Sequence, residues 1–213
     1  MSSLQTGFAI AITACALVGL VLASRVLEGP EKRRKQFFIY YTNLSNALML
    51  LYHALLLCGG GVRRALLHPS VQLSMAVCVF VTFLIYFFVL TRFGRHHSSD
   101  PTKPFGVRRV SNVFVHYLVP LLTVAEWVLT AEKSALTAAD ALWWLVIPLA
   151  YVVFIILRAR TGKIIENTGS LWPYGFIDRE KLGVKRWLRN AALTSLGFYA
   201  LGLLFVGTAK LLS

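Results

Sequence analysis

The sequence predicts an all-α integral membrane protein, a bundle of six transmembrane helices in a single domain over residues 1–213. The chain is strongly apolar, its apolar segments have the length of membrane spans, and its basic residues cluster in every second connection. Of the 213 residues, 57% are hydrophobic, and the mean hydropathy is +0.65. A soluble domain of this size cannot bury so much apolar surface, so a lipid bilayer is the expected environment.

Six apolar segments come close to the length that a bilayer requires, which is about 20 mostly apolar residues for a helix. No segment shows the alternating pattern of a membrane β-barrel strand. The fifth segment is short, and the sixth is diluted by Asn190, Thr194 and Ser195. The expected spans are about 7–23, 37–57, 71–90, 110–130, 141–157 and 188–212.

The charges between these segments predict how the bundle is oriented. The net charge is +13, and the first, third and fifth connections hold 18 of the 22 Lys and Arg residues. Basic residues concentrate in cytosolic loops, so these connections are expected in the cytosol and both chain ends outside. Because the charges stand in short blocks between apolar runs, anionic lipid headgroups are the expected partners, and nucleic acid is not.

No cofactor or metal site is expected from the pattern of ligand-type residues. The three cysteines lack CxxC or metal-ligand spacing, so they are expected to be small buried hydrophobic residues. His53 and His116 differ in depth by about 16 Å along their helices, which disfavours haem ligation by the pair. The cysteines are Cys15, Cys58 and Cys78.

Polar residues recur at helical spacing on one face of the second and of the fourth expected span. Such groups are costly in hydrocarbon, so these faces are expected to point into the bundle or into a water-filled cavity. On the second span the residues are Thr42, Ser45, Asn46, Met49 and His53, and on the fourth they are Asn112, His116, Thr123 and Glu126.

Depth in the membrane sorts these residues into two pairs. Thr42 and His116 each lie six residues from the cytosolic end of their span, or about 9 Å at 1.5 Å per residue. His53 and Glu126 lie about 25 Å from the same end. We therefore expect Thr42 to be level with His116 near the inner face, and His53 to be level with Glu126 near the outer face.

A hydroxyl beside a neutral imidazole is the minimal unit of nucleophilic catalysis, and a low-dielectric site favours the neutral form. Thr42 and His116 are therefore the candidate catalytic residues. Asn112 lies one helical turn before His116 and is a candidate to orient it. Glu126 is about 15 Å from His116 along the helix, too far to act as its orienting acid.

Other polar residues are candidates to bind the substrate or to support the site. Asn43 or Asn46 is a candidate donor to an oxyanion. Ser45 shares the polar face of the second span, and Tyr86 in the third span lies near the depth of Thr42 and is a candidate donor to a substrate.

The sequence also allows two alternatives to catalysis. In a proton-coupled transporter or channel, His53 and Glu126 act as the proton relay. In a structural membrane protein, the polar faces only hold helices together. On the structural reading Thr42 bonds back to its own helix, and His116 bonds across to a neighbour.

Three segments resemble a known family. Residues 38–46 (FIYYTNLSN) resemble the second-helix motif of a predicted six-transmembrane bacterial family, and residues 116–120 (HYLVP) resemble its fourth-helix histidine region. Residues 172–178 (WPYGFID), expected to form a re-entrant or interfacial turn, resemble its Tyr-Pro-Tyr-Pro-Phe-(Leu/Ile)-Asp motif. That family is similar to the eukaryotic androgen-induced and androgen-dependent membrane hydrolases.

The resemblance implies an intramembrane threonine hydrolase in a bacterial inner membrane. The eukaryotic relatives cleave fatty-acid esters of hydroxy fatty acids, and the roles of their threonine and histidine correspond to Thr42 and His116. Membrane lipid or a fatty-acid ester is thus the implied substrate. The chain departs from the pattern at Asn43, where the hydrolases have an aromatic residue, and at Trp172 and Gly175, which replace Tyr and Pro.

Overall fold

The computed structural model describes residues 1–31, 35–91 and 107–213, and the side chains of 89–91 and 107–109 are not described. The described residues form helices, with one isolated β-bridge between Ile165 and Ser170. Part of the predicted basic surface lies outside the described residues, namely Lys32, Arg33, Arg34, Arg92, Arg95 and Lys103.

Five helices in the described part of the chain are long and apolar enough to cross a membrane, which is compatible with an integral membrane protein. Two of these spans change to a wider π-helical form along their length. The five are α1 (Ser3–Ser24); α4 (Pro69–Leu84), continuing into η3 (Ile85–Thr91); α5 (Val107–Val113) with η5 (Phe114–Leu118) and α6 (Val119–Thr130); α7 (Asp140–Trp143) with α8 (Val146–Ala159); and α9 (Arg179–Leu212).

The expected second span corresponds to α2 (Tyr41–Cys58), which follows the short η2 (Phe37–Ile39). It has 18 residues, but the polar face carried by residues 42–53 makes it less apolar than the other five helices. The count of six spans is therefore not confirmed. α2 packs against both α1 and α4. Its polar face consequently lies inside the bundle.

Proline and glycine explain where two of the spans bend. Pro148 has no N–H to donate to the Trp144 carbonyl, and its ring crowds that carbonyl. Around Pro148 the backbone forms hydrogen bonds to the carbonyl three residues earlier, from the Leu145 N–H to Leu142 and from the Ile147 N–H to Trp144. In α9, Gly183 has φ of 73°, which separates a first short turn from the long apolar helix.

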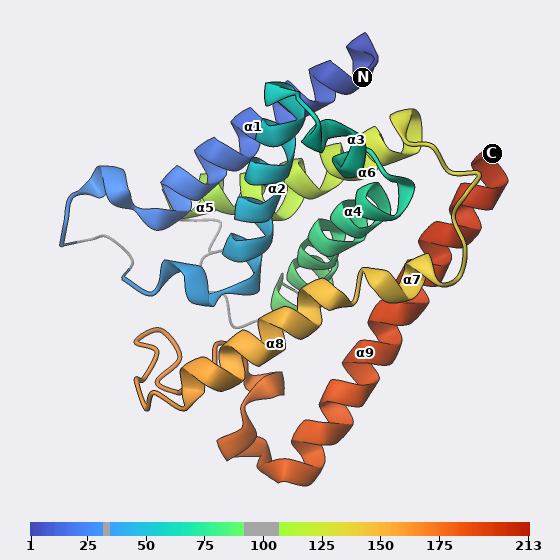
Figure 1. Ribbon diagram of the computed structural model, residues 1–213. Helices are drawn as coiled ribbons and strands as arrows, with labels where there is room; N and C mark the ends of the chain where they lie inside the picture. Colours follow the sequence, from blue (N-terminus) through green and yellow to red (C-terminus); the bar gives the residue numbers. More distant parts are fainter. Residues whose placement is uncertain (32–34, 92–106) are drawn as a thin grey trace.

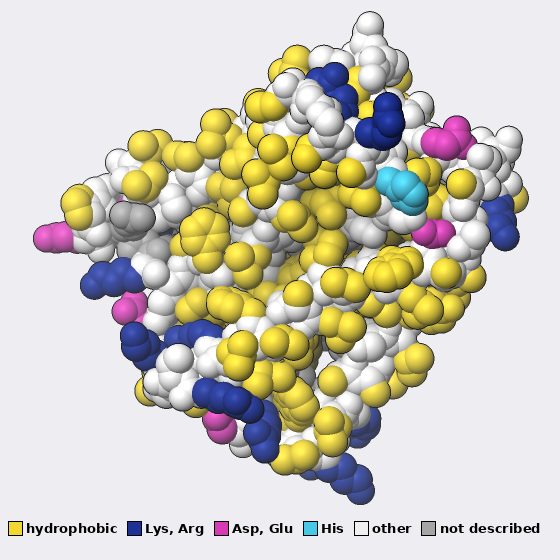
Figure 2. All heavy atoms as spheres, in the orientation of Figure 1, with side chains coloured by type: hydrophobic (Ala, Val, Ile, Leu, Met, Phe, Trp, Pro, Cys, Tyr) yellow, Lys and Arg dark blue, Asp and Glu magenta, His cyan; other side chains and the backbone are white. Residues whose placement is uncertain are grey.

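The ends of the bundle differ in charge. Figure 1 shows both chain ends at its upper right, whereas the connection that follows α1 lies at its left and the connection that follows α8 at its lower left. In Figure 2 most of the dark blue basic side chains lie at the lower left and bottom, fewer lie at the top and right, and yellow apolar side chains cover much of the surface between them. Large apolar residues on the outside, such as Leu149, Leu196 and Leu204, are more than half exposed, as expected for contact with lipid.

Three short elements, η1 (Val26–Glu28), α3 (Val62–Leu66) and η6 (Gly175–Ile177), lie in the connections.

Candidate active site

A cavity of about 180 Å³ lies between the start of α2, the π-helical segments η3 and η5, the helices α8 and α9, and the connection between those two helices. Its wall is mainly aliphatic and aromatic, and a few polar groups converge on it. Small-molecule sites in proteins have this composition. The polar groups include both catalytic candidates, Thr42 and His116, together with Tyr86 and Tyr174.

Thr42 differs from most other hydroxyl residues of the bundle in how its hydroxyl is used. A buried hydroxyl in a helix normally bonds to the carbonyl three or four residues earlier. Thr82 does so at 2.7 Å and Thr123 at 2.8 Å. Among the described residues, the Thr42 hydroxyl makes no such bond and interacts instead with the phenol of Tyr174. The hydroxyl is thus presented to the cavity.

His116 lies in the π-helical segment η5, and Pro120 explains why the helix widens there. Pro120 cannot donate to the carbonyl of His116 and its ring crowds that carbonyl. The Val119 N–H donates to Phe114, five residues earlier, instead of to Val115. Such π-helical turns are rare and are frequent at functional sites. The wider turn carries the His116 side chain into the cavity wall.

The ring of His116 is held by Tyr86. The two rings stack with 4.0 Å between centroids and 17° between planes. Asn112 donates from its amide nitrogen to the Tyr86 hydroxyl at 3.2 Å. Asn112 was expected to orient His116, but its amide bonds to Tyr86, so its effect on the imidazole passes through the phenol ring.

The expected oxyanion donors on α2 are used elsewhere. The Asn43 amide donates to the Phe37 carbonyl at 2.7 Å. The Asn46 amide donates to the Thr42 carbonyl at 2.8 Å and to the Val115 carbonyl at 3.0 Å. Neither residue lines the cavity, so these contacts give no support to the expectation that one of them binds an oxyanion. Ser45 likewise donates to the Thr42 carbonyl, at 3.1 Å.

The segment 170–178 forms one wall of the cavity, and its residues 172–178 were expected as a re-entrant or interfacial turn. The Tyr174 hydroxyl accepts a hydrogen bond from the first backbone N–H of α2, that of Tyr41, at 3.1 Å. Burial raises the pKa of Tyr174 to about 12, so its phenol keeps its proton. In the sequence, the aromatic residues beside a proline indicated that this segment forms a turn. They did not indicate that the turn packs against the start of α2.

Asp178 fixes this segment to the start of α9. Its carboxylate accepts from the Ser170 hydroxyl at 2.7 Å and from the Lys181 N–H at 3.1 Å. Burial opposes the charge, but these hydrogen bonds outweigh it and lower the pKa of Asp178. The Trp187 indole also donates to the Ile177 carbonyl at 3.1 Å. The aromatic wall is therefore tied to α9 at both of its ends.

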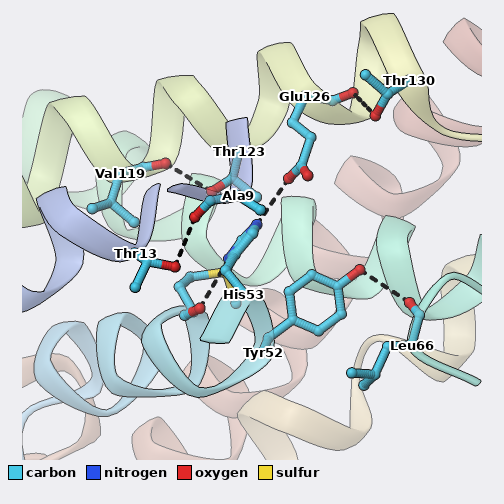
Figure 3. Close-up of polar contacts among 10 residues, drawn as sticks. Ala9, Thr13, Tyr52, His53, Leu66, Val119, Thr123, Glu126 and Thr130 are labelled. Atoms are coloured by element: carbon cyan, nitrogen blue, oxygen red, sulfur yellow. Dashed lines mark hydrogen bonds and ion pairs between the residues drawn. The ribbon is translucent and has the colours of Figure 1, made fainter. Parts of the chain in front are cut away.

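His53 and Glu126 form a hydrogen bond of 2.8 Å in the bundle interior. Figure 3 shows the imidazole reaching from α2 to the carboxylate on α6. The other ring nitrogen lies 2.9 Å from the Met49 carbonyl, which can only accept, so that nitrogen carries a proton. His53 and Glu126 thus lie level with each other, as their spacing in the sequence predicted. Neither residue lines the cavity.

Comparison of the chain with protein-family models, curated proteins and solved structures finds no match. The described residues hold no cluster of three or more His, Cys, Asp or Glu that could bind a metal ion. The function of the chain is therefore inferred from the geometry of the cavity.

Proposed function

We propose that the chain is an intramembrane lipid-ester hydrolase in which Thr42 is the nucleophile and His116 the general base. One observation carries the proposal. A hydroxyl that makes no bond to its own helix and an imidazole from a π-helical turn line the same mainly apolar cavity. An apolar wall suits an acyl chain, and the two polar groups suit its ester.

The reaction balances with these two groups. The Thr42 oxygen attacks the ester carbonyl, and His116 takes the hydroxyl proton. The tetrahedral intermediate then expels the alcohol, which receives that proton from His116. Water repeats the sequence on the acylated Thr42: His116 takes a proton from the water, the fatty acid leaves, and the Thr42 oxygen recovers its proton.

Two features of the site suit the negative charge of the tetrahedral intermediate. Tyr86 lines the cavity, and because Asn112 donates to its oxygen, the phenol proton remains available for an oxyanion. The N-terminus of α2, where Thr42 lies, carries the positive end of the helix dipole. Tyr86 thus takes the role for which Asn43 and Asn46 were candidates.

The orientation and substrate class belong to the same proposal. The basic connections favour a cytosolic position for the end of the bundle near Thr42, with six spans, α2 included, and both chain ends outside. The ester would then lie just beneath the inner headgroups of a bacterial inner membrane. Fatty-acid esters are the substrate class that the family resemblance implies.

Hydrolysis of branched fatty-acid esters by the purified protein tests the proposal. His116→Gln should lower the rate by about 10²- to 10⁴-fold, the usual contribution of a general base. Thr42→Ala should give only background hydrolysis, and Thr130→Val, a hydroxyl deletion on α6, should retain the rate of the unsubstituted protein. Equal turnover by the unsubstituted protein and Thr42→Ala would remove the proposal.

A buried ionisable pair favours one alternative, a proton-coupled transporter or channel. His53 and Glu126 share a hydrogen bond in the interior, as a proton relay requires. A relay also needs a path on both sides of it, and neither residue lines the cavity. The hydrolase remains the better-supported function. In the structural alternative, substitution of Thr42 or His116 changes stability alone.

A further inference from the structure

The π-helical turn that carries His116 leaves one carbonyl without a donor from its own helix. In a regular helix the Val119 N–H would donate to Val115, but here it donates to Phe114. In a continued π-helix the donor would be residue 120, which is proline and has no N–H. The Val115 carbonyl, directly before His116, therefore needs a partner from another element.

Asn46 supplies that partner from α2. Its amide nitrogen lies 3.0 Å from the Val115 carbonyl and 2.8 Å from the carbonyl of Thr42. One NH₂ group thus links the backbone of Thr42, the proposed nucleophile, to the backbone of Val115, which directly precedes His116. Both of its hydrogens are used, and the side chain is fully buried.

Contact from α1 limits movement of the same turn on another side. A Cβ atom added at Gly19 would lie 2.8 Å from the Cβ of Phe114 and 2.9 Å from a methyl of Val115. The turn is thus packed closely against α1 at Gly19 while the Asn46 amide holds its free carbonyl.

An asparagine at this position satisfies one buried polar atom and leaves another without a partner. Its side-chain oxygen is buried and accepts no hydrogen bond from any described residue. A buried polar atom without a partner costs about 1–3 kcal/mol. An apolar residue of similar size would avoid that cost, but it would leave the Val115 carbonyl without its donor.

Building on the proposed hydrolase, we propose that Asn46 is a positioning residue that sets the separation between Thr42 and His116 by bonding to both backbone turns. It touches neither the substrate nor the reacting atoms. Its effect should appear in the rate of the chemical step, since a misplacement of 1 Å between reacting groups can cost about 100-fold.

The test compares Asn46→Leu with Thr123→Val, which removes a buried hydroxyl bonded to the carbonyl of Val119, just after the same turn. Two quantities are measured for each variant and for the unsubstituted protein. One is the rate at which an alkyl fluorophosphonate labels Thr42 as a function of pH. The other is amide hydrogen exchange in the segment 114–119.

Asn46→Leu should slow labelling by about ten-fold or more and weaken its dependence on pH, because the base no longer reaches the hydroxyl. Exchange in 114–119 should accelerate in this variant and not in Thr123→Val. Labelling that depends on Thr42 but proceeds equally in Asn46→Leu would overturn this inference alone. Labelling that is the same in Thr42→Ala would overturn the hydrolase, and this inference with it.

Discussion

The imidazole of His116 lies face to face with the phenol ring of Tyr86, their centroids 4.0 Å apart. Each ring comes from a π-helical segment, His116 from η5 and Tyr86 from η3. The stacking restricts rotation of the imidazole, and the hydrogen bond from Asn112 fixes the phenol. The pair therefore joins the orientation of the imidazole to a phenol that lines the cavity.

Tyr86→Phe and Tyr86→Leu separate these two contributions. The Phe variant keeps the stacked ring and loses the hydroxyl, so we expect kcat for ester hydrolysis to fall by about 100-fold, as for loss of one oxyanion donor. The Leu variant loses the stacking as well and should fall further, with KM little changed in both. Hydrolysis at the unsubstituted rate in both variants would exclude Tyr86 from the site.

The bond between His53 and Glu126 should stabilise the fold without taking part in hydrolysis. Glu126→Ala leaves a buried ring nitrogen without its partner. The free energy of unfolding in detergent should fall by about 1–3 kcal/mol if the pair is neutral and by about 3–5 kcal/mol if it is ionic. The double variant His53→Leu with Glu126→Leu should recover most of the loss, because apolar residues replace both partners.

Proton flux into proteoliposomes decides between this structural role and the transport alternative. The hydrolase account predicts the same flux for the unsubstituted protein and for Glu126→Gln, at the level of empty liposomes. A flux that requires Glu126, in a protein without esterase activity, would establish the relay instead.

The sequence was sufficient for those features that depend on composition and helical spacing. The apolar segments predicted the long helices, and a rise of about 1.5 Å per residue placed His53 level with Glu126, to which it is hydrogen-bonded. The same spacing predicted an equal depth for Thr42 and His116, and both residues line the cavity. The second span was harder to assign, because the polar face that points inward also lowers the apolar character of α2. The count of six spans consequently stays a prediction.

The contacts that depend on packing between helices were not readable from the sequence. Spacing put Asn43 and Asn46 near Thr42, but only the fold shows that their amides bond to backbone carbonyls. Pro120 was visible as a residue that disturbs a helix, whereas the π-helical turn and the carbonyl that it frees became visible only in the structure. The docking of Tyr174 on Tyr41 joins residues 133 positions apart.

The carboxylate of Asp178 should stabilise the protein at neutral pH and not in acid. Asp178→Ala removes the cap of α9, at about 1 kcal/mol, and the bond from Ser170, at about 1 kcal/mol. Because folding lowers the pKa of this group, its contribution is complete above the ordinary pKa of aspartate and is lost as the pH falls through the folded value.

Thermal unfolding of the two proteins at several pH values measures this contribution. The difference in Tm should be complete at pH 7 and should shrink below about pH 4. A difference that is absent at pH 7, or that grows in acid, would mean that Asp178 does not act through its charge.

Close packing between α7 and α9 should make Gly202 intolerant of a side chain. A Cβ atom there would lie 2.7 Å from the indole nitrogen of Trp144 and 3.0 Å from the carbonyl of Ala141. Gly202→Ala should therefore lower the free energy of unfolding by about 1–3 kcal/mol.

Gly197→Ala is the matched control for this effect, because the same helix offers open space at that position. Alanine is the better helix former, so this variant should gain about 0.5–1 kcal/mol. Equal effects of the two substitutions would show that α7 and α9 do not pack as the structure describes.

The position of a covalent adduct tests the hydrolase most directly. The protein is treated with an alkyl fluorophosphonate, digested, and the modified residue is located by mass spectrometry. The account predicts a single adduct on the Thr42 oxygen, which is lost in Thr42→Ala and forms far more slowly in His116→Gln. An adduct on another residue, or one that forms at the same rate without His116, would contradict it.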